Sequence, residues 1–126
     1  MKIYLIEDDP IYAEFIGKAL KSDPANELKT FYSGEECLKS LTSSLPDVVI
    51  IDYKLPGISG IDLYEKIKPR ITEKNKVILL SSLDDGNMVL SFIQRGIRDY
   101  VIKDENVIDS LMSLLSGKED DYYLFN

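Results

Sequence analysis

The feature that most constrains the fold of this chain is a strict alternation of short, mostly apolar runs with segments of helical periodicity. Such an alternation predicts strands joined by helices, which form a parallel sheet through right-handed crossovers. Because a closed barrel needs eight such units, five units predict an open, doubly wound α/β sheet. The predicted strands are Ile3–Ile6, Leu28–Phe31, Val48–Ile51, Val77–Leu80 and Tyr100–Ile102.

Between the strands, apolar residues three and four positions apart predict five helices. Asp9-Pro10 is typical of a helix start, with an aspartate cap and proline at the first helical position. We expect one domain over residues 1–116, followed by a tail or the start of a linker at 117–126. The predicted apolar stripes are Ile11, Phe15, Ile16, Ala19 and Leu20; Cys37, Leu38 and Leu41; Leu63, Tyr64 and Ile67; Met88, Val89, Phe92 and Ile93; and Val107, Ile108, Leu111, Leu114 and Leu115.

Composition excludes several kinds of site. The 126 residues contain no histidine, which excludes Ser-His-Asp and Cys-His catalysis and histidine metal sites. The net charge of −7 repels phosphate backbones, so we expect no nucleic acid binding by this chain. Cys37 has no partner for an internal disulfide, and no apolar run approaches the ~20 residues that span a bilayer. We therefore expect a cytoplasmic domain without a membrane segment.

Polar residues follow four of the five predicted strands. Glu7-Asp8-Asp9 follows the first strand, Asp52 the third, Ser81-Ser82 the fourth and Lys103 the fifth. In open parallel sheets, ligands bind at the carboxyl ends of the strands. The sequence therefore predicts a chemically active edge of the sheet.

An acidic cluster forms at this edge if the first and third strands are neighbours, as they are in the strand order 2-1-3-4-5. Glu7, Asp8 and Asp52 then converge, and two carboxylates about 4 Å apart repel by roughly 4 kcal/mol at an effective dielectric near 20. Lys103 supplies one compensating charge, and a divalent cation would supply two. All-oxygen ligands without His or Cys favour Mg²⁺ or Mn²⁺. Asp9 is expected only to cap the first helix.

With these residues the chain resembles the receiver domain of two-component response regulators, from Lys2 to about Ser116. The resemblance implies the flavodoxin-like, doubly wound (βα)5 parallel sheet with strand order 2-1-3-4-5. The spacings are 44 residues from Asp8 to Asp52, 29 from Asp52 to Ser81 and 22 from Ser81 to Lys103, and together they are specific to the family. The matching motifs are Ile6–Pro10, Asp47–Gly60, Leu80–Ser82 and Asp99–Lys103.

The resemblance implies a role for each of these residues. Asp52 is the expected phosphoacceptor, a carboxylate nucleophile that takes a phosphoryl group from a sensor histidine kinase or phosphotransfer protein. Asp8 is the expected direct Mg²⁺ ligand, and Glu7 holds the ion through water. Asp52 and the backbone carbonyl of Lys54 complete the implied ligands. Lys103 and the metal would neutralise the phosphoryl oxygens.

A switch is also implied by the resemblance. Ser81 would hydrogen-bond the attached phosphoryl group, and Tyr100 would turn inward behind it. The surface of the fourth helix, fifth strand and fifth helix would then favour an output partner or domain, which we expect to be transcriptional, or a homodimer. Met88, Val89 and Met112 are candidates for that surface, although core packing also explains them.

One residue departs from the family pattern. Receivers usually have proline after the conserved lysine, often with a cis bond, and here Asp104 follows Lys103. A non-proline cis bond costs about 2.5 to 4 kcal/mol, so the sequence leaves the isomer of this bond open. Asp104 could instead cap the fifth helix. A trans bond with the amine pointing away from Asp52 would remove the role implied for Lys103.

We therefore predict a phosphoaccepting receiver domain that assists its own phosphorylation and dephosphorylation but is not an enzyme acting on a metabolite. The main alternative is a phosphorylation-independent, receiver-like interaction module. A flavodoxin-like electron carrier shares the sheet order, but Glu7-Asp8-Asp9 would repel a flavin phosphate. An aspartyl phosphatase would need a second acid two residues after the first and a threonine soon after, which Asp8–Ile11 does not supply.

Overall fold

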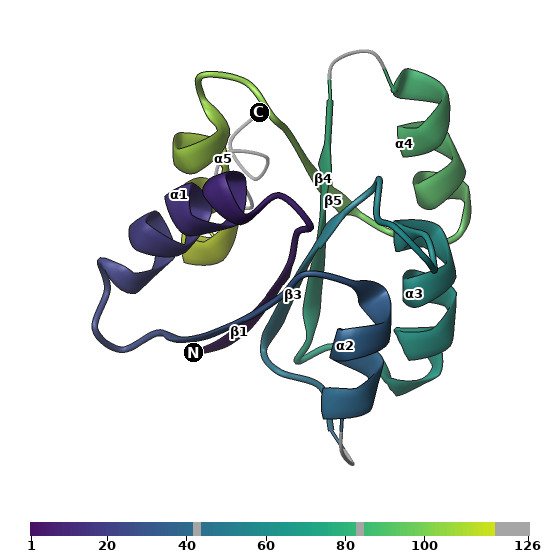
Figure 1. The fold of residues 1–126 in the computed structure, drawn as a ribbon, viewed down its shortest axis with the longest axis horizontal. Helices are drawn as coiled ribbons and strands as arrows, with labels where there is room; N and C mark the ends of the chain where they lie inside the picture. The colour runs from purple at the N-terminus through teal and green to yellow at the C-terminus, as the bar shows by residue number, and fades with distance from the viewer. Residues whose placement is uncertain (42–43, 83–84, 118–126) are drawn as a thin grey trace.

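Five parallel strands form one sheet with helices on both faces (Figure 1). The computed structural model describes residues 1–41, 44–82 and 85–117. The order β2-β1-β3-β4-β5 confirms the predicted fold, and every strand matches its predicted run to within one residue at each end. The strands are β1 (Lys2–Ile6), β2 (Glu27–Phe31), β3 (Val48–Asp52), β4 (Lys76–Ser81) and β5 (Asp99–Ile102).

The helices cover the sheet in two layers. Figure 1 shows α1 and α5 on one face and α2, α3 and α4 on the other. As predicted, Asp9 caps α1, because its carboxylate accepts the Ile11 N–H at 3.0 Å. Gly117, with φ of 74°, ends α5 in the left-handed conformation that glycine adopts most easily. The helices are α1 (Pro10–Lys21), α2 (Gly34–Ser40), α3 (Gly60–Ile67), α4 (Gly86–Gln94) and α5 (Val107–Ser116), with a 3₁₀ turn η1 (Lys68–Arg70) after α3.

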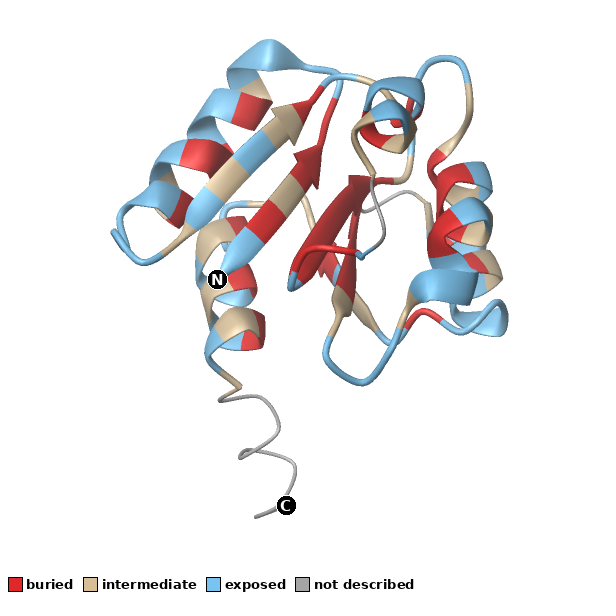
Figure 2. Ribbon diagram, turned by 90° about the horizontal axis from the view of Figure 1, so that it is seen from below, coloured by how far each residue is buried: buried red, intermediate tan, exposed pale blue. Residues whose placement is uncertain are grey.

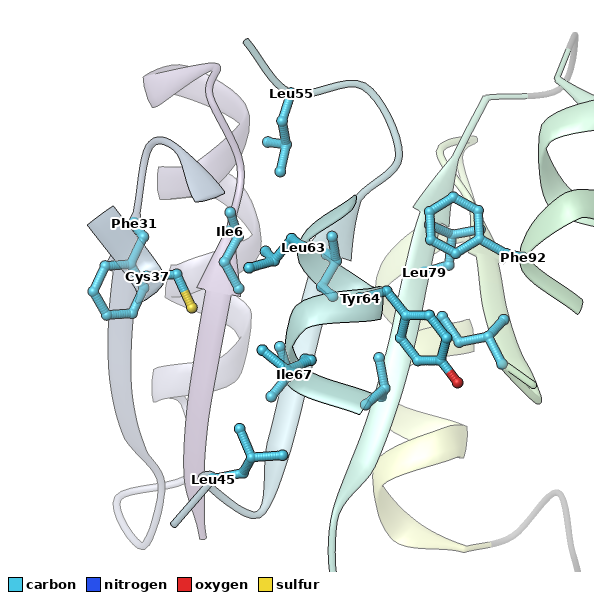
Figure 3. Close-up of a cluster of buried hydrophobic side chains, with 14 of the residues drawn as sticks. Ile6, Phe31, Cys37, Leu45, Leu55, Leu63, Tyr64, Ile67, Leu79 and Phe92 are labelled. Atoms are coloured by element: carbon cyan, nitrogen blue, oxygen red, sulfur yellow. The ribbon is translucent and has the colours of Figure 1, made fainter. Parts of the chain in front are cut away.

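Two apolar cores hold the layers together. β3 is buried along its whole length, as is expected of a central strand covered on both faces (Figure 2). Figure 3 shows the core between the sheet and α2 to α4, where Leu63 and Ile67 of α3 lie over the strands and Phe92 joins from α4. Ile16, Leu20 and Leu111 belong to the core on the opposite face. Each such side chain stabilises the fold by roughly 1.5–3 kcal/mol when fully buried.

The predicted stripe of α1 is wrong at two positions. Ile11 is 82% exposed and Phe15 is 50% exposed. The cause is the orientation of the helix, which brings Gly17 against β2, where an added Cβ would lie 3.2 Å from a methyl group of Leu28. The stripe predicted for α4 is wrong in the same way at Met88 and Ile93, which are exposed. The buried residues of α1 are Ala13, Ile16, Gly17 and Leu20, and those of α4 are Val89 and Phe92.

The carboxyl-terminal tail falls largely outside the described residues. Gly117 is described, and 118–126, predicted as tail or linker, lies beyond them. Within the described part of the chain, no helix has the length and apolar character needed to cross a membrane.

Candidate functional site

The parallel register gathers the predicted site residues at one edge of the sheet. Because β1 pairs in register with β3, Glu7, the residue after β1, lies beside Asp52 at the end of β3. Ser81 ends β4, and its carbonyl oxygen accepts the Lys103 N–H at 2.7 Å. This hydrogen bond brings the residue after β5 to the same edge, as the sequence predicts.

The loop after β3 is fixed tightly around Asp52. The N–H of Tyr53 donates to the Leu80 carbonyl at 3.0 Å, and the N–H of Lys54 donates to Asp52 Oδ1 at 3.3 Å. α3 starts so close to this loop that a Cβ on Gly60 would lie 2.5 Å from the Asp52 carbonyl oxygen. Glycine is therefore required at this position for the loop to hold Asp52 where it is.

Three carboxylates come together in this loop region. One oxygen from each of Glu7, Asp8 and Asp52 lies within 4.8 Å of the others. Glu7 and Asp52 are 0% and 2% exposed, whereas Asp8 is exposed. A pocket of about 400 Å³ opens beside them, with Lys54 and Lys103 in its lining.

The donor set suits a hard divalent cation. Glu7 Oε2 is buried without a hydrogen-bond partner, and a charged oxygen left in this way is costly unless a cation or water satisfies it. Three carboxylates without nitrogen or sulfur ligands favour Mg²⁺. Lys54 lies at the pocket as the predicted carbonyl ligand requires, but its carbonyl role stays a prediction.

Lys103 is the counter-charge of the cluster. Its Nζ lies 2.7 Å from Glu7 Oε1 and 3.2 Å from Asp52 Oδ2, and its side chain is only 20% exposed. Burial, followed by the contact with Asp52, raises the pKa of Glu7 to about 8, against the pull of Lys103. Burial alone would lower the pKa of Lys103, but its hydrogen bond to Glu7 and the charge of Asp52 outweigh this and raise it. The protonated amine is thus the favoured form at this site.

The departure at Asp104 leaves the lysine contact intact. None of the described peptide bonds is cis, so the bond between Lys103 and Asp104 is trans. The amine nevertheless lies 3.2 Å from Asp52 Oδ2, so the contact that the implied role requires is present, and the role itself stays a prediction. Asp104 is not the cap residue of α5, which is Asn106, but its carboxylate accepts the Asn106 N–H at 2.8 Å.

The two predicted switch residues lie at different depths. Ser81 is fully buried, and its Oγ has no hydrogen-bond partner. Tyr100, on β5, is 45% exposed. An unpartnered buried hydroxyl costs free energy, so a group arriving at the pocket and bonded by Ser81 would relieve that cost.

Sequence reasoning missed Tyr12. The Lys103 amine lies 4.7 Å from the centroid of the Tyr12 ring. Tyr12 stands three residues after the Asp9 cap, in the first turn of α1, and that position next to the acidic motif was the available signal. Tyr12 is not part of the apolar stripe predicted for this helix, and its side chain is only partly buried.

Sequence reasoning also missed a polar network on the other side of the pocket. Tyr53 and Ser82 place their hydroxyl oxygens 3.5 Å apart, and the Ser82 hydroxyl donates to the carboxylate of Asp85. This network links the loop after β3 to the loop after β4. No spacing in the sequence indicates it, because the three residues come from two loops and meet only through the strand order.

Relatives of known class match most of the chain. A family model described as "Response regulator receiver domain" matches residues 3–115. The transcriptional regulatory protein AfsQ1 of Streptomyces coelicolor is 34% identical over 101 residues, covering 80% of this chain and 44% of that protein. The phosphate regulon regulator PhoB of Rhizobium meliloti is 31% identical over 103 residues, with 81% and 45% covered. The chain thus spans about half the length of these curated relatives.

Solved structures agree with this assignment. The BeF₃-activated receiver domain of DrrB is 30% identical with a TM-score of 0.78, covering 91% of this chain and 93% of that one. The response regulator DrrB of Thermotoga maritima, described as an OmpR/PhoB homologue, gives a TM-score of 0.77 at 30% identity, with 95% and 53% covered. The chain belongs to the receiver domain family of two-component response regulators.

Proposed function

We propose that this chain accepts a phosphoryl group on Asp52, in the presence of Mg²⁺, from a sensor histidine kinase or a phosphotransfer protein. The observation that carries the proposal is the buried Asp52 carboxylate, which lies within 4.8 Å of two further carboxylates and 3.2 Å from the Lys103 amine. A carboxylate held between acids and a fixed cation is the arrangement that phosphoryl transfer requires.

Asp8, Glu7, Asp52 and the Lys54 carbonyl are the proposed metal ligands. The three carboxylates lie close enough to share one ion, and the unpartnered Glu7 Oε2 supports a positive charge beside it. When bound, Mg²⁺ supplies charge neutralisation for the transferring phosphoryl oxygens.

The chain's own residues then carry the transfer. A carboxylate oxygen of Asp52 attacks phosphorus in line, a new O–P bond forms, and the bond between phosphorus and the donor breaks with its electron pair going to the donor atom. Lys103 Nζ, 3.2 Å from Asp52 Oδ2, offers N–H donors to the phosphoryl oxygens. The chain changes only its own phosphorylation and turns over no metabolite.

We further propose that Ser81 and Tyr100 form the switch. The unpartnered Ser81 Oγ is a donor available to the phosphoryl group, and Tyr100 is exposed enough to move inward. A phosphoryl group that binds one arrangement better shifts the population toward it. The surface of α4, β5 and α5 then contacts an output partner or a second copy.

Only one of the three candidate residues for the surface of α4, β5 and α5 is exposed. Met88 is exposed on α4, whereas Val89 is buried and Met112 packs against the core. Met88, Leu90, Ile93 and Tyr100 are the exposed large hydrophobic side chains of α4 and β5.

Residues 1–116 form the proposed receiver unit, and 117–126 are proposed as a tail or the start of a linker. Since the curated relatives are named as transcriptional regulators and are about twice as long, we propose a transcriptional output supplied outside this chain. The net charge of −7 supports the proposal that this chain itself does not bind DNA. A cytoplasmic location remains a prediction from the sequence.

Intact mass after incubation with acetyl phosphate tests the proposed function. We expect the wild type to gain one phosphoryl group with Mg²⁺ and none without it, and Asp52→Asn to gain none while remaining folded. An equal gain in Asp52→Asn would show that Asp52 is not the acceptor.

The same assay separates the remaining alternative. The electron-carrier and phosphatase alternatives belong to other families, so the receiver assignment leaves the phosphorylation-independent module. Absence of any gain, in a folded chain that also fails to bind Mg²⁺, would favour that module.

A further inference from the structure

We propose that Tyr12 is a positioning residue for phosphoryl transfer, whose ring holds the Lys103 amine at the mouth of the carboxylate cluster. The inference rests on the proposed function and adds to it a residue outside the acidic, hydroxyl and lysine motifs. It joins α1, at the start of the chain, to the loop between β5 and α5 at its end.

The contact has the geometry of a cation–π interaction. Lys103 Nζ lies 4.7 Å from the ring centroid, inside the ~6 Å limit for such contacts. The Lys103 side chain is 20% exposed, so its charge is partly removed from water and the attraction to the ring is less screened. The same amine contacts Glu7 and Asp52, and the ring adds a third contact to it.

The helix cap and one aromatic neighbour flank Tyr12. Its N–H donates to the Asp9 carboxylate at 3.3 Å in the helix cap, and the ring of Phe15 lies 5.9 Å away. The Tyr12 hydroxyl is buried without a hydrogen-bond partner. The hydroxyl therefore gains no hydrogen bond in this orientation, whereas the ring gains its contact with the Lys103 amine.

The ring matters most when the carboxylates are engaged elsewhere. In the proposed function Glu7 and Asp52 would also hold Mg²⁺, so the metal would share their attraction for the lysine. A neutral aromatic face does not compete for the metal and keeps its attraction for the amine. Leucine at this position would fill similar space without that attraction, whereas phenylalanine would keep the aromatic face.

Phosphorylation rates test this role. With acetyl phosphate and saturating Mg²⁺, we expect Tyr12→Leu to slow phosphorylation about threefold to 30-fold, the range of a partly desolvated cation–π contact. Tyr12→Phe should restore a rate close to that of the wild type. Tyr32→Leu is the matched control, because it removes an exposed aromatic ring away from Tyr12 and Lys103, and its rate should be unchanged.

A double-variant comparison separates positioning from general packing. In a Lys103→Met background, Tyr12→Leu should cause no further slowing, because the amine that the ring holds is gone. Equal slowing in both backgrounds would overturn the inference, since the ring would then act through the fold rather than through Lys103.

Proton NMR of the metal-free chain tests the contact without any reaction. The Lys103 ε-methylene signals, identified by their loss in Lys103→Met, should be shifted upfield by the ring in the wild type and in Tyr12→Phe. Since this shift needs only the wild type and Lys103→Met, it tests the contact even where Tyr12→Leu fails to fold. Signals at the position of an exposed lysine in the wild type would overturn the inference.

The phosphorylation assays distinguish failure of the role of Tyr12 from failure of the proposed function. A wild type that takes up no phosphoryl group overturns the proposed function and this role with it. A wild type that is phosphorylated, with Tyr12→Leu equally fast, overturns the role of Tyr12 alone.

Discussion

The two edges of the sheet treat their polar groups in opposite ways. At the carboxyl edge, Glu7 Oε2, Tyr12 Oη and Ser81 Oγ are buried without hydrogen-bond partners, and they are the only such side-chain atoms in the described part of the chain. At the amino edge, the Lys2 N–H donates to the Asp47 carboxylate at 2.7 Å, and Lys76 Nζ donates to the Leu114 carbonyl at 2.8 Å.

These polar groups of the amino edge are thereby satisfied within the protein. Lys76 neutralises the carboxyl end of α5, where the helix dipole favours a cation. The Asn75 side chain donates to the Pro46 carbonyl at 2.9 Å and ties two connections together. Groups satisfied in this way stabilise the fold and leave little for a ligand to add.

The carboxyl edge instead keeps a local cost that a ligand can remove. Buried polar atoms without partners destabilise a fold, and one of them here, Glu7 Oε2, belongs to the acidic cluster. Satisfied hydrogen bonds that stabilise the fold therefore lie at one edge, and the groups of the proposed phosphoryl transfer lie at the other. Substitutions at the two edges should therefore separate into effects on phosphoryl transfer and effects on unfolding.

The largest effect is expected from removing the fixed cation of the carboxyl edge. Lys103→Met should slow phosphorylation by acetyl phosphate about 100- to 1000-fold, the typical loss for one donor to a developing anion. Mg²⁺ affinity, measured by calorimetry, should stay the same or increase, because a competing positive charge is gone. An unchanged rate of phosphorylation would remove Lys103 from the mechanism.

A smaller effect is expected from the exposed acid of the cluster. Asp8→Asn should weaken Mg²⁺ binding by at least the 10- to 100-fold that loss of an outer ligand partner costs. The measurement is the rise in melting temperature with Mg²⁺, which follows ln(1 + [L]/Kd). Asp9→Asn makes the same charge change one residue away and keeps a good helix cap, so equal weakening in both variants would argue against a specific ligand.

The pH dependence of the metal-free chain should change at Glu7. Its pKa is raised from an ordinary 4.5 to about 8, so the folded chain binds a proton more tightly than the unfolded chain does. The free energy of unfolding should therefore fall as pH rises through this interval. Glu7→Gln should remove the fall, so its melting temperature should exceed that of the wild type at about pH 8 and approach it near the ordinary pKa.

If the melting temperatures of the wild type and Glu7→Gln changed in parallel with pH across this interval, the raised pKa of Glu7 would not be destabilising the ionised fold. Saturating Mg²⁺ should reduce the difference between the two proteins, because the metal satisfies the ionised carboxylate.

The smallest effect is expected at the amino edge. Lys76→Met should lower the free energy of unfolding by about 1 kcal/mol, the net value of one hydrogen bond, as measured by denaturant titration. Its Mg²⁺ affinity and phosphorylation rate should match the wild type. Lys74→Met, at an exposed neighbouring position, is the control for the charge change. A loss of phosphorylation in Lys76→Met would contradict the prediction that substitutions at the amino edge affect only the free energy of unfolding.

The strands were predictable because burial on both faces leaves a local signal. Val48–Ile51 and Val77–Leu80 are continuous apolar runs, and both lie in the centre of the sheet. The helix faces were less predictable. Ile11 and Phe15 have the spacing of a core stripe yet are exposed, since the orientation of α1 depends on the approach of Gly17 to β2, which no local pattern encodes.

The residues of the candidate site also differ in how far the sequence predicts them. Glu7, Asp52, Ser81 and Lys103 were predictable because strand ends of a parallel sheet meet at one edge. The ring of Tyr12 was not, since its contact with Lys103 joins residues 91 positions apart in sequence through the packing of α1 beside the last loop. Contacts between helices and loops depend on tertiary orientation rather than on local spacing.

A structure of the chain with Mg²⁺ and beryllofluoride, the agent named for the activated DrrB domain, tests the proposed phosphoryl site. We predict the adduct on the Asp52 carboxylate, with Ser81 Oγ and Lys103 Nζ within hydrogen-bond distance of it and Tyr100 turned inward. Ser81 Oγ would then have the partner that it now lacks. An adduct on another residue, or an unchanged Ser81 beside a bound adduct, would contradict the claim that this edge is built for a phosphoryl group.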